Sequence, residues 1–125
     1  MLYTGIDLIE IERIARAAER WGDRFLIRVY TPAELAIYRA RPASLAARWA
    51  AKEAVIKAWS GSRFAKRPML PEGIHRDIEV VTDMWGRPKV RLTGAIAEHL
   101  KDVTIHLSLT HEADTAAAVA ILEER

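Results

Sequence analysis

The chain has 125 residues, with 19 basic and 17 acidic side chains and a formal net charge of +2. Half of the residues are hydrophobic, which excludes a disordered chain. The absence of cysteine excludes disulfides, zinc–thiolate sites, iron–sulfur clusters and a thiol nucleophile. We expect one domain over residues 1–125, because a chain of this length suits a single hydrophobic core.

No segment predicts export or membrane insertion. The start of the chain lacks the basic region of an export signal. The longest apolar run, residues 116–122, is far shorter than the ~20 residues that a membrane helix needs. We therefore expect a soluble, cytoplasmic protein.

The first half of the chain reads as one strand followed by helices. Residues 2–8 have the pattern of a short strand, and apolar residues then recur at helical spacing. Gly22 predicts that this helix ends or bends. Trp21 and Phe25 lie on its apolar face, so we expect both in the core.

Two further helices are predicted from their start signals. Thr31-Pro32-Ala33-Glu34 has the composition of a capping box and predicts a short helix to about Arg39. After a break at Pro42, Ser44 is the expected cap of a long helix that runs to about Trp59.

The second half of the chain is predicted to contain mainly strands. We expect, in order, a loop, a hairpin, a short helix and two final strands, over residues 62–73, 78–82 with 88–92, 94–101, and 104–110 with 116–122. Helices that are segregated from mostly antiparallel strands predict an α+β fold, with a small sheet and one long central helix.

Arginines are concentrated in the first half of the chain. Residues 13–48 contain eight arginines and three acidic residues. Four of the arginines recur along one face of the first helix: Arg13, Arg16, Arg20 and Arg24. This face is either solvated or binds an acidic partner. A nucleic-acid domain would normally add exposed aromatic residues or a stronger net charge, so we favour an acidic protein.

Two acidic residues and one lysine are candidates for chemistry. Asp7 lies at the end of an apolar strand and either caps the next helix or binds a cation. Glu53 and Lys57 are four residues apart on the long helix, where they would by themselves form an ordinary surface ion pair. The small residues around Glu53 predict an open face with room for a ligand or another subunit: Ala46, Ala50 and Ala54.

The strand that ends at His111 is a second candidate. The hydroxyls of Ser108 and Thr110, the imidazole and the N–H groups of the turn could donate hydrogen bonds to a phosphate, and a solvated hairpin is the alternative. His75 and His99 have no partner at metal-ligand spacing, so we expect both on the surface.

Three stretches of the sequence share a resemblance. Residues 5–14 read GIDLIEIERI, residues 48–58 read RWAAKEAVIKA, and residues 106–111 read HLSLTH. Together they resemble bacterial holo-[acyl-carrier-protein] synthases, a group of 4′-phosphopantetheinyl transferases. The central stretch matches the W/F-x-x-K-E-A-x-x-K-A signature of this family, and the resemblance covers nearly the whole chain.

The resemblance implies an enzyme that works on coenzyme A. Its reaction transfers the 4′-phosphopantetheine arm to a serine of apo acyl carrier protein, an acidic protein, and releases adenosine 3′,5′-bisphosphate. The same chemistry on a polyketide or secondary-metabolite carrier is one alternative. A non-catalytic binding module that uses the arginine face is another. The resemblance also implies a homotrimer. From the composition and charge pattern we expect no nucleic-acid or membrane partner.

The resemblance assigns roles to individual residues. Asp7 and Glu53 would hold Mg²⁺, Glu53 would also accept the serine proton, and Lys57 would stabilise the leaving phosphate. Coenzyme A would be bound mainly by His111, and also by Ser108, Thr110 and Arg48. The carrier would be bound by Arg13, Arg16, Arg20 and Arg24.

One stretch departs from the family pattern. The family commonly has Phe-Gly-Thr-Gly after the central motif, where this chain has Trp59-Ser60-Gly61-Ser62 followed by a long basic loop. We expect Arg63 in this loop to contact the 3′-phosphate of coenzyme A.

Overall fold

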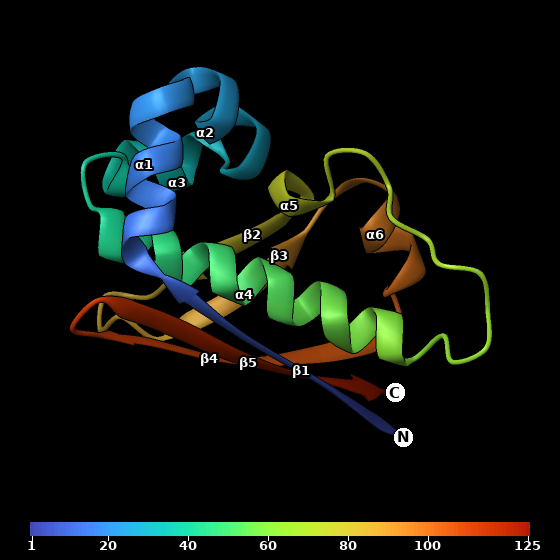
Figure 1. Ribbon diagram of the computed structural model, residues 1–125. Helices are drawn as coiled ribbons and strands as arrows, with labels where there is room; N and C mark the ends of the chain where they lie inside the picture. The colour runs from blue at the N-terminus through green and yellow to red at the C-terminus, as the bar shows by residue number, and fades with distance from the viewer.

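The computed structural model describes residues 1–125 and confirms the α+β fold and the order of elements that the sequence predicts (Figure 1). No helix has the length and apolar character needed to cross a membrane. The elements are β1 (Leu2–Glu10), α1 (Ile11–Trp21), α2 (Asp23–Val29), α3 (Pro32–Tyr38), α4 (Pro42–Gly61), α5 (Ile74–Asp77), β2 (Ile78–Thr82), β3 (Pro88–Leu92), α6 (Gly94–His99), β4 (Val103–Glu112) and β5 (Thr115–Glu124).

The strands form two antiparallel sheets. Three strands pair in the order β1-β5-β4, and β2 with β3 forms a separate hairpin. The N-terminal strand therefore pairs with the C-terminal one, so that Asp7 lies opposite Ala118. On the other side of β5, Leu109 of β4 pairs with the same Ala118. The first and last motifs of the sequence therefore share one sheet.

Helix α4 lies across one face of the three-stranded sheet, and α1, α2 and α3 cluster at its N-terminal end (Figure 1). Its sheet-facing side consists of alanines that are completely buried: Ala46, Ala47, Ala50, Ala51, Ala54 and Ala58. The alanine face is therefore not open, and the predicted room for a ligand or subunit is wrong. The facing strands also carry small residues, Gly5 and the buried alanines of β5, so that helix and sheet pack closely.

Gly5 marks the closest approach of β1 to α4. A Cβ atom at this position would lie 1.9 Å from the carbonyl oxygen of Ala54. We expect Gly5→Ala to lower the free energy of unfolding by about 1–3 kcal/mol or more, because neither backbone can move aside cheaply. Urea denaturation measures this change.

Gly61→Ala is the matched control, since nothing lies near its Cβ, and it should leave stability unchanged or raise it by up to about 1 kcal/mol. Equal stability of the two variants would contradict the packing described here.

The helix starts only partly follow the predictions. The capping box of Thr31 and Glu34 is confirmed, with both reciprocal hydrogen bonds present. Ser44 does not cap α4, because the helix already begins at Pro42, whose ring suits the first helical position. Gly22, with φ of +53°, separates α1 from α2 as its sequence position predicts.

Trp21 is not a core residue. Its side chain is 48% exposed, whereas Phe25 is half-buried against Tyr30 and Trp49. The guanidinium groups of Arg20 and Arg24 lie 4.9 and 5.9 Å from the Trp21 ring. The core prediction is wrong for Trp21, the last residue of α1, although Ile14 and Ala18 of the same stripe and Phe25 of α2 do pack in one core.

Candidate active site

The β1–α4 junction brings Asp7 and Lys57 together across fifty residues of sequence. Lys57 Nζ donates to Asp7 Oδ1 at 2.9 Å and to the carbonyl oxygen of Ile6 at 3.0 Å. The close packing at Gly5 makes this contact possible, because it places the middle of β1 directly beside α4. Lys57 itself remains half exposed. An ammonium group has three N–H donors, so one of them remains available for a ligand.

Glu53 lies one helical turn before Lys57, at the same junction. Its Oε1 is 3.1 Å from His75 Nε2. This hydrogen bond lowers the pKa of Glu53, the charges of His75 and Lys57 act in the same direction, and partial burial opposes them. Glu53 is therefore ionised near neutral pH and carries a full negative charge one turn from Lys57.

His75 is not the unpartnered surface residue that its sequence position predicted. Only 24% of its side chain is exposed, and its ring stacks on Trp49 with centroids 4.8 Å apart and an interplanar angle of 8°. Trp49 and Glu53 are four residues apart on α4 and thus share a face. No sequence signal links residue 75 to that face, because a long loop separates α4 from α5.

A buried ion pair supports the junction from behind. Lys52 Nζ donates to Glu34 Oε1 at 2.9 Å and to the carbonyl oxygens of His75 and Ile78 at 2.9 and 2.6 Å. Glu34 Oε2 accepts a further bond from the main-chain N–H of Val80. Burial lowers the pKa of Lys52, and the neighbouring Glu34 carboxylate opposes that effect. The pair joins α3, α4 and β2, although the sequence assigned Glu34 only to a cap.

The predicted phosphate cradle on β4 is not assembled within one chain. His111 is in register with Ala116 and Ile9, whereas Ser108 is in register with Val119 and Ile6. Because side chains alternate along a strand, His111 shares the face of Asp7, while Ser108 and Thr110 point to the opposite face. All three β4 residues are exposed.

The two arginines that the sequence predicts to bind coenzyme A, Arg48 and Arg63, lie in different environments. Arg48 is only 6% exposed, and its guanidinium lies 3.6 Å from the centroid of the Tyr38 ring. The guanidinium thus packs within the chain, and its contact with coenzyme A stays a prediction. Arg63 lies just beyond the C-terminal end of α4, and its guanidinium donates to the carbonyl oxygen of Arg67.

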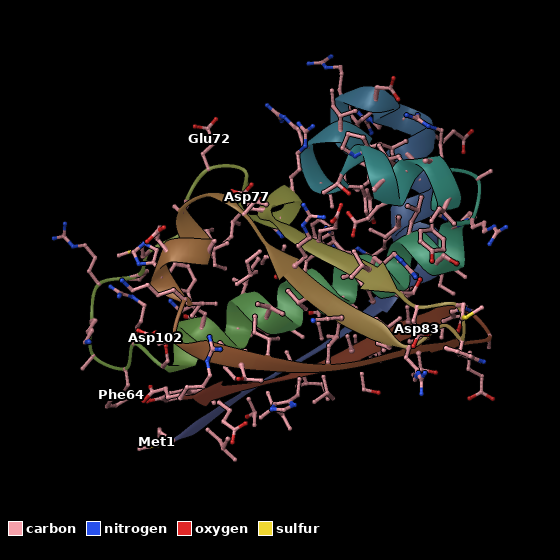
Figure 2. The ribbon with its side chains drawn as sticks, turned by 180° about the vertical axis from the view of Figure 1, so that it is seen from behind. Met1, Phe64, Glu72, Asp77, Asp83 and Asp102 are labelled. Carbon is pink, nitrogen blue, oxygen red and sulfur yellow. The ribbon has the colours of Figure 1, made fainter.

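The arginine face of α1 and α2 reaches an open cleft of about 930 Å³ through Arg24. Its predicted members are all exposed: Arg13, Arg16, Arg20 and Arg24. Only Arg16 pairs with an acid of its own helix, Glu12. The walls of the cleft combine cations with apolar groups and include Trp21, Arg24, Phe25, Arg28, Leu70 and His75. Figure 2 shows Glu72, which also lines this cleft, near Asp77 at one edge of the molecule.

The family model described as the 4′-phosphopantetheinyl transferase superfamily matches residues 3–121. The chain belongs to this superfamily. A holo-[acyl-carrier-protein] synthase from Mycobacterium sp. (strain KMS) is 68% identical over 124 residues, which are 96% of this chain and 95% of the relative.

Two solved structures of this transferase family share the fold. Acyl carrier protein synthase from Mycobacterium tuberculosis has a TM-score of 0.83 and 63% identity, over 98% of this chain and 97% of the other. The ACPS–CoA complex of Chronobacterium ammoniagenes has a TM-score of 0.89 and 35% identity, over 100% of this chain and 98% of the other. The family predicted from the three sequence stretches is thus confirmed.

The acidic residues at the junction fit a magnesium ion that is shared with a substrate. Mg²⁺ usually binds through one or two carboxylates together with substrate phosphates and water. Asp7 and Glu53 offer such hard oxygen ligands. No group of three or more His, Asp or Glu side chains forms a site that could hold a metal through protein ligands alone.

Proposed function

We propose that the chain transfers the 4′-phosphopantetheine arm of coenzyme A to a serine of apo acyl carrier protein. The junction of Asp7, Glu53 and Lys57 carries this proposal, because Lys57 is ion-paired with the carboxylate of Asp7 and its charge also acts on the carboxylate of Glu53, one helical turn away on α4. Membership of the transferase superfamily and a relative in complex with coenzyme A support it. The proposed transferase domain spans residues 1–125 and works in the cytoplasm.

In this proposal Asp7 and Glu53 hold Mg²⁺, which supplies positive charge to the pyrophosphate of coenzyme A. Glu53 is ionised and accepts the proton of the attacking serine hydroxyl. Lys57 is held by two hydrogen bonds and directs its third N–H to the leaving phosphate, whose developing charge it stabilises. His111 shares the face of Asp7 and binds a phosphate of coenzyme A, while Arg63 reaches its 3′-phosphate.

Mass spectrometry of an apo carrier protein, incubated with coenzyme A, Mg²⁺ and this chain, tests the proposal. We expect the carrier to gain the mass of one phosphopantetheine arm, and no gain when its serine is replaced by alanine. A fatty-acid carrier and a polyketide carrier, compared at equal concentration, distinguish the two classes of substrate. An unchanged mass for both carriers would contradict the proposed function.

The acidic carrier is proposed to bind at the arginine face. Arg20 and Arg24 are exposed without an acidic partner, and Arg24 lines the cleft that leads to His75. Each exposed charge contact is worth about 0.2–1 kcal/mol, so the loss of two contacts in Arg20→Glu with Arg24→Glu should raise KM for the carrier by about two- to thirtyfold.

The KM for coenzyme A should stay unchanged in that variant. Lys101→Glu is the control for Arg20→Glu alone, because it reverses one charge beside Asp102, at the far end of the molecule from α1 (Figure 2). An equal rise of the carrier KM in the control would contradict a specific arginine surface. Steady-state kinetics with varied carrier give both values.

A homotrimer is the proposed assembly. The face of the three-stranded sheet that α4 does not cover carries an apolar patch, with Ile6 65%, Leu8 71% and Val119 39% exposed. Ile6 and Val119 are opposite each other in the ladder, so the patch is continuous. A face of this kind favours association with other copies.

We expect Ile6→Glu to convert a trimer into monomers of 14.1 kDa, because a carboxylate in an apolar interface loses its hydration. Sedimentation velocity measures the mass. Ile37→Glu replaces a similarly exposed isoleucine on α3 and should leave the assembly intact. A wild-type chain that sediments as a monomer would contradict the proposed assembly.

A further inference from the structure

We propose that His75 is a positioning residue for Glu53: it holds the Glu53 carboxylate in the orientation that the transfer reaction uses. This inference rests on the proposed function, because it assigns a task within the same site. It starts from the 3.1 Å contact between His75 Nε2 and Glu53 Oε1, which joins α5 to the helix that carries Glu53 and Lys57.

The hydrogen bond has a defined direction. An ionised carboxylate can only accept hydrogen bonds, so His75 Nε2 must carry the proton and donate it. This bond uses one lone pair of Oε1 and leaves Oε2 free for the cation and the substrate proton that the proposed function assigns to Glu53. A glutamate on a helix has several rotamers, and one fixed oxygen limits the carboxylate to the few that keep this bond.

His75 is itself fixed from two sides. Its ring lies parallel to Trp49, which is anchored on α4 four residues before Glu53 and packs against Phe25. Its main-chain carbonyl accepts a hydrogen bond from the buried ammonium of Lys52, which also holds the carbonyl of Ile78. Helix α5 has only four residues and would not be rigid by itself, so these contacts determine where the imidazole lies.

A second histidine of the chain shows what a purely packing role looks like. His99 lies on Trp59 with centroids 5.3 Å apart and an angle of 32°, and it has no carboxylate partner. The chain therefore contains two histidine–tryptophan contacts on α4, and only the one at Trp49 continues to a catalytic carboxylate. His99→Ala is accordingly the matched control for His75→Ala.

The test compares wild type, His75→Ala, His75→Gln and His99→Ala. Partners that orient a metal-ligating side chain typically contribute about 10–100-fold to activity or metal affinity. We expect His75→Ala to lower kcat by about 10–100-fold, with a smaller change in KM for coenzyme A. The affinity of His75→Ala for Mn²⁺, measured by electron paramagnetic resonance in the presence of coenzyme A, should also decrease by about 10–100-fold.

His75→Gln should recover both values to within about threefold of wild type, because its amide N–H can reach Glu53 Oε1 as the imidazole does. His99→Ala should behave as wild type. Wild-type kcat and Mn²⁺ affinity in His75→Ala would overturn the proposal, and so would a glutamine variant that folds but is as impaired as the alanine variant. If alanine prevents folding, the glutamine variant decides alone.

The outcomes separate this inference from the proposed function. If wild type fails to modify any carrier, the proposed function fails, while the Mn²⁺ affinities still compare His75 with its variants. If wild type transfers the arm and His75→Ala equals it in every measurement, only the role of His75 fails.

Discussion

Glu53→Gln is expected to lower kcat for arm transfer by about 10²–10⁴-fold while the chain keeps its fold. Glutamine has the same shape as glutamate and can still accept a hydrogen bond from His75, but it can neither take a proton from serine nor carry a negative charge. Asp7→Asn should cause a loss of similar size, since it removes the second proposed magnesium ligand. A single-turnover assay with a saturating carrier measures both effects.

The control for these substitutions is Glu98→Gln, which makes the same change on the exposed side of α6 and should leave kcat unaltered. Circular dichroism should show equal helix content in all variants. A Glu53→Gln variant with kcat within about threefold of wild type would contradict the assignment of Glu53 as the proton acceptor.

Lys52→Met is expected to lower the free energy of unfolding by about 3–5 kcal/mol, because it leaves the carboxylate of Glu34 buried without a cation. Both side chains are almost fully buried, with 0% and 1% exposed, and the substitution also leaves the carbonyls of His75 and Ile78 without their donor. Urea denaturation followed by circular dichroism measures the loss.

Two comparisons isolate the cause of this loss. Lys57→Met removes a half-exposed lysine from the same helix and should cost at most about 1 kcal/mol. The double variant Lys52→Met with Glu34→Leu should be more stable than the sum of the single losses predicts, since no unpaired charge remains. Strictly additive losses would contradict a coupled buried pair.

The local features of the fold could be predicted from the sequence. The capping box at Thr31, the hairpin around Gly86 and the end of the first helix at Gly22 each follow from residues within one turn of chain. The central helix and its Glu53–Lys57 spacing are local in the same sense. Caps, turns and helix ends depend on the backbone geometry of a few neighbouring residues. They can therefore be predicted without knowing the contacts made elsewhere in the fold.

Features that depend on distant contacts could not be predicted in this way. The alanines of α4 are compatible with either an open ligand face or a closely packed one. They are buried because β1 pairs with β5 and the resulting sheet covers them. Glu34 meets Lys52 and His75 meets Glu53 across loops whose course the sequence does not indicate. The separation of His111 from Ser108, by contrast, follows from the alternation of side chains along β4, which the sequence does indicate.

The central claim is that Asp7 and Glu53 bind one divalent ion together with coenzyme A. Titration with Mn²⁺ in the presence of coenzyme A, followed by electron paramagnetic resonance, tests this claim most directly. We predict one bound ion per wild-type chain and affinities that are at least about tenfold weaker in both Asp7→Asn and Glu53→Gln. Wild-type Mn²⁺ affinity in either variant would contradict the claim.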